Sequence, residues 1–182
     1  ECTLCPRECR VDRTAGKLGV CGESAILRVA SIDAHFGEEP PISGTHGSGT
    51  IFFSGCTLLC TFCQNYQISC FHMGGLTTVE RVAEQVFELV HRQGVHNLNL
   101  VTPDHFLPHA IDLIQRLRAG GVELPVVFNS SGFEKVEILQ QAAEYVDIYL
   151  PDFKYSDAEL AHSLSRCRSY PMVALDAIAE MV

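Results

Sequence analysis

From Thr77 onward the sequence alternates between helix and strand patterns, which restricts the folds that the chain can adopt. Val79, Val82, Ala83 and Val86 recur at helical spacing, and short β-branched and aromatic runs are ended by turn residues. The expected strands are 50–53, 97–102, 126–129 and 146–150, and the expected helices are 77–93, 107–118, 134–143, one after Ser156 and one that Pro171 opens at its first turn. Such alternation predicts right-handed βαβ units and a parallel sheet.

Local signals refine this prediction. The sequences Thr77-x-x-Glu80 and Ser156-x-x-Glu159 have the form of capping boxes, which mark helix starts. Residues 26–32 form a further apolar run. We expect a strand there that connects the amino-terminal segment to the domain that follows.

Three cysteines follow the first strand of the alternating region, at the spacing Cys56-x3-Cys60-x2-Cys63. The strand ends at Ser54-Gly55, so the thiols are expected on a loop at its carboxyl end. Three thiolates can hold three irons of a 4Fe-4S cluster, whereas a closed cluster takes four cysteines. The pattern therefore predicts a cluster with one iron open to an outside ligand.

The surroundings of these cysteines are uncharged in sequence. Residues 40–79 contain no Asp, Glu, Lys or Arg, which favours a weakly charged and partly dry pocket. A zinc site with Cys70 or His72 as the fourth ligand, a disulfide, and buried structural thiols are the alternatives.

A second cysteine group opens the chain, with Cys2-x2-Cys5-x3-Cys9 and then Cys21. Four thiols so arranged can close a metal site, and both an iron–sulfur cluster and a structural zinc accept four thiolates. The sequence leaves these two choices open. It divides the chain into a cysteine-rich segment, residues 1–35, and a core, residues 36–182.

Polar residues gather where the predicted parallel strands end. The carboxyl ends of such strands form one mouth, where α/β barrels place their chemistry. Turn formation explains each residue taken singly, and Asp152 could merely pair with Lys154. Taken together beside the cysteines, they predict a binding site made of Asn99, Thr102, Asn129, Ser131, Asp152 and Lys154.

Composition excludes several classes of protein. Thirteen basic residues face 22 acidic ones, for a net charge of −9, which argues against a nucleic-acid partner. No charge-free segment is apolar enough to span a bilayer, and no signal peptide pattern opens the sequence. Nine cysteines without such a signal favour metal ligation in a reducing compartment. We expect a cytoplasmic protein with no membrane partner.

The cysteine motif, with Phe62 just before its last cysteine, resembles the signature of the radical S-adenosylmethionine (radical SAM) enzymes. The sequences EEPPISG at 38–44, GSGTIFFSGC at 47–56 and CQN at 63–65 resemble homologues of the pyruvate formate-lyase activating enzyme, which are relatives of the glycyl-radical activases. The resemblance runs from about Cys2 to the end of the chain.

This resemblance implies an activity and a set of roles. The open iron would bind the amino and carboxylate groups of S-adenosylmethionine, and reduction would break the C5′–S bond to give a 5′-deoxyadenosyl radical that abstracts hydrogen. Phe62 and Asn65 would lie beside the nucleoside, and Asp152-Phe153-Lys154 matches the Asp-x-Lys of the activases. The residues expected to hold the methionyl and ribose parts are Asn99, Thr102, Asn129 and Ser131.

The same resemblance implies partners. The reductant would be a flavodoxin or a ferredoxin, and the substrate a glycyl-radical enzyme, another protein or a small molecule. A different class of function stays open: an iron–sulfur or zinc module without catalysis, used for electron transfer or protein assembly.

The sequence also departs from the family. The activases carry Gly-Gly-Glu-Pro where this chain reads Val101-Thr102-Pro103-Asp104. Asp104 is expected to be a solvated loop carboxylate, and Cys70, His72 and His105 ordinary loop residues.

Length is the other departure. A radical SAM core has six strand–helix units and four are counted here, so we expect a partial (β/α) barrel, truncated at both ends, with an unpaired edge at the fourth strand.

Overall fold

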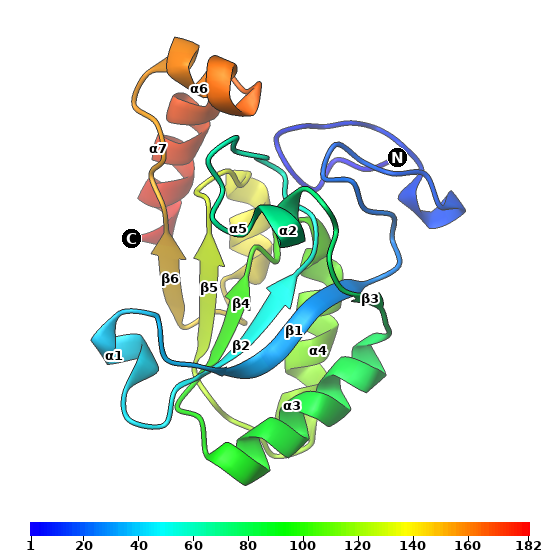
Figure 1. The fold of residues 1–182 in the computed structure, drawn as a ribbon, viewed down its shortest axis with the longest axis vertical. Coiled ribbons are helices and arrows are strands. Elements are labelled where there is room, and N and C mark those ends of the chain that lie inside the picture. The colour runs from blue at the N-terminus through cyan, green and yellow to red at the C-terminus, as the bar shows by residue number, and fades with distance from the viewer.

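The computed structural model describes residues 1–182 and centres on one six-stranded sheet (Figure 1). The strand order is β3-β1-β2-β4-β5-β6. The strands are β1 (Arg28–His35), β2 (Ser48–Phe53), β3 (Gly75–Leu76), β4 (Leu98–Val101), β5 (Val126–Ser130) and β6 (Ile148–Pro151). Strands β2, β4, β5 and β6 are parallel, and β1 is antiparallel to β2 and β3. This confirms the α/β fold with a partial parallel barrel, in which β6 forms one edge.

Helices α3, α4 and α5 cover one face of this sheet (Figure 1). The longer helices are α3 (Val79–Gln93), α4 (Leu107–Ala119), α5 (Val136–Ala142), α6 (Ala158–Ser165) and α7 (Tyr170–Met181). The short ones are η1 (Arg13–Ala15), α1 (Pro40–Ser43), α2 (Tyr66–Ser69) and η2 (Asp104–Phe106). None of them combines the length and the apolar character needed to cross a membrane.

Helix α3 shows why the alternating pattern folds in this way. Its buried side chains include Val79, Val82 and Val86, which lie three or four residues apart and therefore share one face. That face packs against Ile51 of β2 and Leu100 of β4 in the main core. Burying such side chains stabilises the fold by about 1.5–3 kcal/mol each.

The start of the sheet differs from expectation. The strand expected over residues 26–32 as a connector is β1, which runs to His35 and pairs antiparallel with β2 from Val29 opposite Phe53 to His35 opposite Ser48. Residues 28–35, assigned from the sequence to the cysteine-rich segment, are therefore part of the central sheet. An apolar pattern predicts a strand but not the direction of its partner, which is why the pairing was missed.

Both predicted capping boxes are displaced by one residue. Thr78 rather than Thr77 caps α3, accepting a hydrogen bond from the Arg81 N–H, and Asp157 rather than Ser156 caps α6, accepting one from the Leu160 N–H. The cap requires an extended backbone and an oxygen within reach of the third helical N–H, and both residues meet these conditions.

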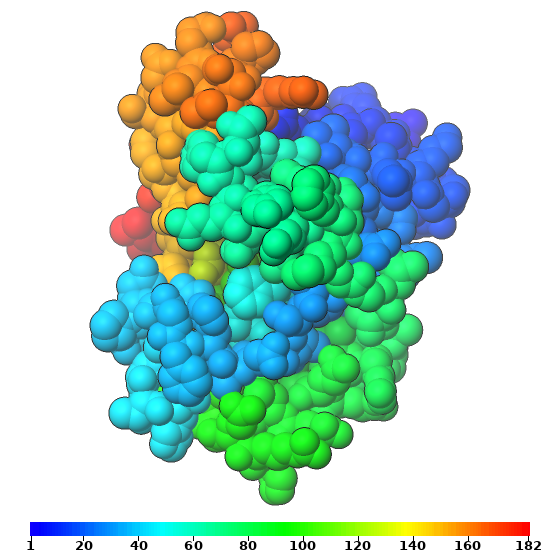
Figure 2. All heavy atoms as spheres, in the orientation of Figure 1, coloured from blue at the N-terminus to red at the C-terminus, as the bar shows by residue number.

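Two arginines fasten the amino-terminal segment to the top of the sheet, where Figure 2 shows this segment (blue) packed against the loop after β2 (teal). Arg7 donates to the carbonyls of Thr57 at 2.8 Å and Leu58 at 3.0 Å. Arg13 donates to the carbonyl of His105 at 2.6 Å. The segment is thus joined directly to the loop that carries the three cysteines.

Candidate active site

A cavity of about 550 Å³ lies at the carboxyl ends of the parallel strands. Cys56, Cys60 and Cys63 are in its wall. The other predicted site residues in this wall are Phe62, Asn65, Thr102, Asn129, Ser131, Asp152 and Lys154. The volume falls within the range of about 300–1,000 Å³ that is usual for small-molecule sites. The structure therefore gathers the cysteines and four strand ends around one space.

Asn99 is the one predicted strand-end residue that does not line the cavity. Its side chain is fully buried within β4, and neither its amide nitrogen nor its amide oxygen has a hydrogen-bond partner. Val101, two residues further along the same strand, lines the cavity instead. Asn99 thus lies deeper in the barrel than the sequence suggested.

The cysteine loop turns sharply and directs polar hydrogens at sulfur. Gly55 and Leu59 both have positive φ, at 82° and 56°. The Leu58 N–H donates to Cys56 Sγ at 3.4 Å, and Ser69 Oγ donates to Cys63 Sγ at 3.3 Å. Such hydrogen bonds stabilise negative charge on cluster ligands.

Burial raises the pKa of Cys56 to about 12, with the negative charge of Asp104 adding to the shift. The thiolate at this position therefore requires a strong local positive charge, which metal ligation supplies. Three thiols on one loop, hydrogen bonds to two of the sulfurs and an adjoining cavity fit a 4Fe-4S cluster.

A single metal ion fits less well. No group of three or more Cys, His, Asp or Glu side chains converges closely enough to hold one ion, whereas a structural zinc needs four ligands around one centre. His72, one proposed fourth ligand, places Nδ1 2.8 Å from the Glu23 carboxylate. Cys70, the other, is exposed and outside the cavity wall, although Ser69 Oγ lies 3.5 Å from its sulfur.

Glu38 and His35 line the cavity and were missed as site residues. Asn129 Nδ2 lies 3.4 Å from each carboxylate oxygen of Glu38. These residues were missed because the sequence does not show that β1 and the turn after it lie over β2 and β5: the His35 ring lies 5.8 Å from that of Phe52, and Glu38 reaches Asn129. The available signal was an acidic pair, Glu38-Glu39, immediately before the charge-free stretch.

Asp104 is not the solvated loop carboxylate that was expected, and His105, expected to be an ordinary loop residue, is buried as well. Asp104 is 3% exposed and its Oδ2 accepts a 2.6 Å hydrogen bond from Thr57 Oγ1, and His105 is 1% exposed with Nε2 2.7 Å from the Ser54 carbonyl. They were misjudged because η2 follows β4 directly and turns both inward. Each holds one residue of the cysteine loop in place.

Glu134 is a second buried carboxyl near Asp104. It is 2% exposed, and neither of its oxygens has a hydrogen-bond partner. Burial, and then the charge of Asp104, raises the pKa of Glu134 well above its ordinary value. The protonated form is therefore favoured in the folded protein.

Glu134→Gln should make the protein more stable at neutral pH. A carboxyl whose folded pKa is raised binds more protons folded than unfolded, so stability is lost as pH rises from its unfolded pKa toward its folded pKa, by about 1.4 kcal/mol per pH unit. The amide does not titrate and removes this loss, so the free energy of unfolding in urea, measured from about pH 5 upward, should change less with pH in the variant than in the wild type. Glu137→Gln, at an exposed site on α5, should keep the wild-type profile, and an unchanged Glu134→Gln profile would contradict the assignment.

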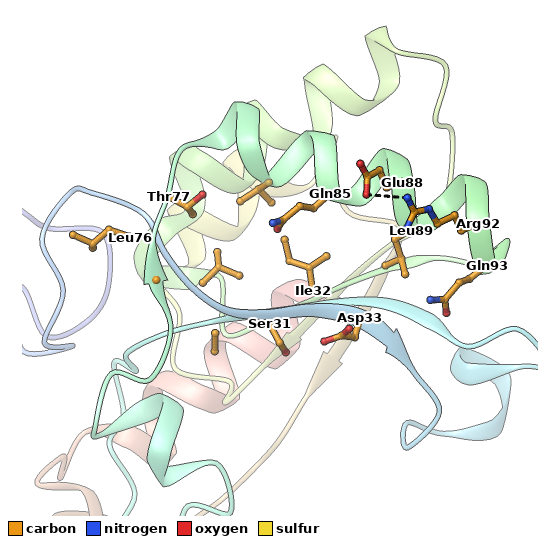
Figure 3. Close-up of a pocket in the computed structure, with 14 residues that line it drawn as sticks. Ser31, Ile32, Asp33, Leu76, Thr77, Gln85, Glu88, Leu89, Arg92 and Gln93 are labelled. Atoms are coloured by element: carbon orange, nitrogen blue, oxygen red, sulfur yellow. Dashed lines mark ion pairs between the residues drawn. The ribbon is translucent and has the colours of Figure 1, made fainter.

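A second cavity, of about 570 Å³, lies between β1 and α3 (Figure 3). Ile32 of β1 and Gln85 of α3 face each other across it, and Arg92 pairs with Glu88 on its rim at 3.7 Å. None of the cysteines or predicted strand-end residues lines it. Its similar volume therefore does not make it the chemical site.

Comparison with known proteins agrees with the site geometry. Residues 50–181, which include most of β2, the cysteine loop and strands β4, β5 and β6, match the radical SAM superfamily. An uncharacterised protein of Methanocaldococcus jannaschii is 30% identical over 174 residues, which cover 93% of this chain and 50% of that protein. The chain thus spans about half the length of the curated relative that it matches. The family model covers well over half of the chain, and the chain belongs to the radical SAM superfamily.

Proposed function

We propose that this chain is a radical SAM enzyme domain that cleaves S-adenosylmethionine reductively, with Cys56, Cys60 and Cys63 as the ligands of a 4Fe-4S cluster. The observation that carries the proposal is the single cavity that the three cysteines share with the ends of the parallel strands. When bound, the cluster supplies the electron that breaks the C5′–S bond and releases a 5′-deoxyadenosyl radical for hydrogen abstraction.

The residues of the cavity wall suit the parts of S-adenosylmethionine. Phe62 is 53% exposed and offers an apolar ring beside the nucleoside. Asn129, Ser131 and Thr102 provide hydrogen-bonding groups for the ribose and methionyl parts. The backbone of Thr102 is in the left-handed region, at φ 51°, and its N–H donates to the Asn129 carbonyl at 2.8 Å. This strained conformation is of the kind that clusters at functional sites.

We further propose that the domain resembles the glycyl-radical activases in its chemistry. The support is the sequence similarity over residues 38–65 and the position of Asp152 and Lys154, which line the cavity and pair at 2.7 Å. The substrate would be a protein glycine or a small molecule, and a flavodoxin or ferredoxin would provide the electron.

Anaerobic electron paramagnetic resonance tests the proposal. The chain would be reconstituted with iron and sulfide, reduced, and recorded with and without S-adenosylmethionine. We expect a 4Fe-4S signal that shifts on addition, because the cofactor binds the open iron. A signal from the Cys56 cluster that ignores the cofactor would overturn the proposal and favour a non-catalytic iron–sulfur module.

Glu38→Gln should weaken S-adenosylmethionine binding by about 10- to 150-fold, since a hydrogen bond to a charged group is worth about 1.5–3 kcal/mol. The chain lacks the glutamate of the Gly-Gly-Glu-Pro motif found in the activases. Glu38 is a carboxylate in the cavity wall that can accept a hydrogen bond from the amino group of S-adenosylmethionine. Calorimetric titration of the reconstituted protein measures the effect. Glu39→Gln, at the exposed neighbouring residue outside the wall, should bind as the wild type does. Equal affinity in both variants would remove Glu38 from the site.

A further inference from the structure

The four amino-terminal cysteines lie together in the fold. Cys5 and Cys21 are 7% and 6% exposed, whereas Cys2 and Cys9 are half-buried. A Cβ added to Gly19 would lie 3.3 Å from the sulfurs of both Cys9 and Cys21, so these two sulfurs flank the same glycine. Arg13 Nη1 lies 4.0 Å from Cys2 Sγ. None of the four forms a disulfide.

The backbone of this segment is shaped around its sulfurs. Glu8 and Arg10, on either side of Cys9, both have positive φ, at 41° and 51°. Such conformations cost about 1–3 kcal/mol each in residues other than glycine. The Arg10 N–H donates to the Cys2 carbonyl and the Glu8 N–H to the Cys5 carbonyl, which closes the chain into a tight knuckle. Ligation of a metal by the surrounding thiolates would offset the cost of those turns.

The position of these sulfurs favours a cluster over zinc. Four thiolates suit either centre, but zinc has no redox chemistry, whereas an iron–sulfur cluster carries electrons. The sulfurs lie beside the loop that carries the other three cysteines, where a second redox centre can exchange electrons with the first.

This cysteine group is also seated directly against the other one. A Cβ on Gly55 would lie only 2.7 Å from the Cys21 carbonyl oxygen, so the residue before Cys56 touches the amino-terminal segment. Arg7, two residues after Cys5, bonds the carbonyls of Thr57 and Leu58. The two cysteine groups therefore share a wall of backbone.

We propose that Cys2, Cys5, Cys9 and Cys21 bind a second iron–sulfur cluster, which lies beside the Cys56 loop and delivers electrons to it. Binding of this cluster by the four cysteines does not depend on the proposed function. Its role in delivering electrons rests on that function. Held by these four thiolates, the second cluster would accept one electron from a reduced flavoprotein or iron–sulfur protein and pass it to the first. The donor would be oxidised by one electron, with no bond or proton exchanged.

Metal content and magnetic resonance of the full chain test the proposal. The reconstituted wild type should hold about eight irons, and Cys9→Ala and Cys56→Ala about four each. Cys167→Ala, which alters a buried thiol outside both groups, should keep about eight. In the fully reduced wild type the two neighbouring paramagnetic centres should broaden each other's signals, and each of the two cluster variants should show a single unbroadened signal.

Several results would overturn the proposal. They are about four irons in the wild type, one zinc per chain in place of the second cluster, or loss of both signals in Cys9→Ala while its circular dichroism stays that of a folded protein. If Cys9→Ala does not fold, the wild-type iron count and broadening still decide. A second cluster with no response of the first to S-adenosylmethionine would sustain this site and reject the proposed function.

Discussion

Replacing Cys56, Cys60 or Cys63 with alanine should abolish the cleavage of S-adenosylmethionine. Each replacement removes one of three thiolates, and a cube held by two cysteines is not retained. Cys56 and Cys60 are 8% and 7% exposed, so water cannot readily replace the lost sulfur. Production of 5′-deoxyadenosine with dithionite as reductant, measured by chromatography alongside iron content, checks the result.

Cys70→Ala is the control for this prediction, because it tests whether a fourth cysteine ligates the cluster. Ser69 Oγ contacts the sulfurs of both Cys63 and Cys70, which makes Cys70 the nearest candidate for a fourth ligand. It lies outside the cavity wall, and we expect its alanine variant to keep both cluster and cleavage. If Cys70→Ala loses the cluster as completely as the other three, the site is closed and the enzyme proposal fails.

Arg7→Ala should lower the free energy of unfolding by about 3 kcal/mol, because hydrogen bonds to charged groups are worth about 1.5–3 kcal/mol each and part of that loss is recovered by water. Its guanidinium bonds four carbonyls, those of Thr57, Leu58, Ser165 and Arg166, and lies 5.5 Å from the centre of the Phe133 ring. Urea unfolding under anaerobic conditions measures the change. Iron content should fall as well, because two of these carbonyls belong to the cysteine loop.

Arg10→Ala is the matched control in the same segment. Its side chain is exposed and makes one 3.6 Å ion pair with Glu8, and exposed pairs of this kind add little to stability. Arg7→Lys should behave like Arg7→Ala, because an ammonium lacks the planar fork that reaches several carbonyls. Wild-type stability in Arg7→Lys would show that charge alone, rather than the fork, holds the segment.

The parallel part of the fold followed from the sequence because its signals are local. The helical spacing of Val79, Val82 and Val86 indicates one buried face, and that face packs against the sheet. The helix starts were misplaced by one residue because Thr77 and Thr78, and Ser156 and Asp157, are adjacent residues that can each cap. The backbone conformation decides which of the two residues caps the helix, and the residue types alone do not predict that conformation.

The antiparallel strand and the buried acids were not predictable in the same way. The pairing of β1 depends on contacts between segments, and it brings Glu38 to the cavity. The burial of Asp104 and Glu134 depends on how η2 packs with the loop before α5. No local sequence pattern predicts that packing. The cysteine triad was identifiable because cluster ligation requires a fixed residue type at a fixed spacing.

The antiparallel pairing of β1 also affects how the cysteine loop is assembled as the chain folds. The connection between β1 and β2 is residues 36–47, whereas β2 reaches its parallel partner β4 only after residues 54–97. The entropy lost on closing a loop grows with its length, and folding slows as contacts become more distant in sequence. The strand that delivers the cysteines therefore gains its first partner from a nearby segment, before the slower parallel crossovers have to form.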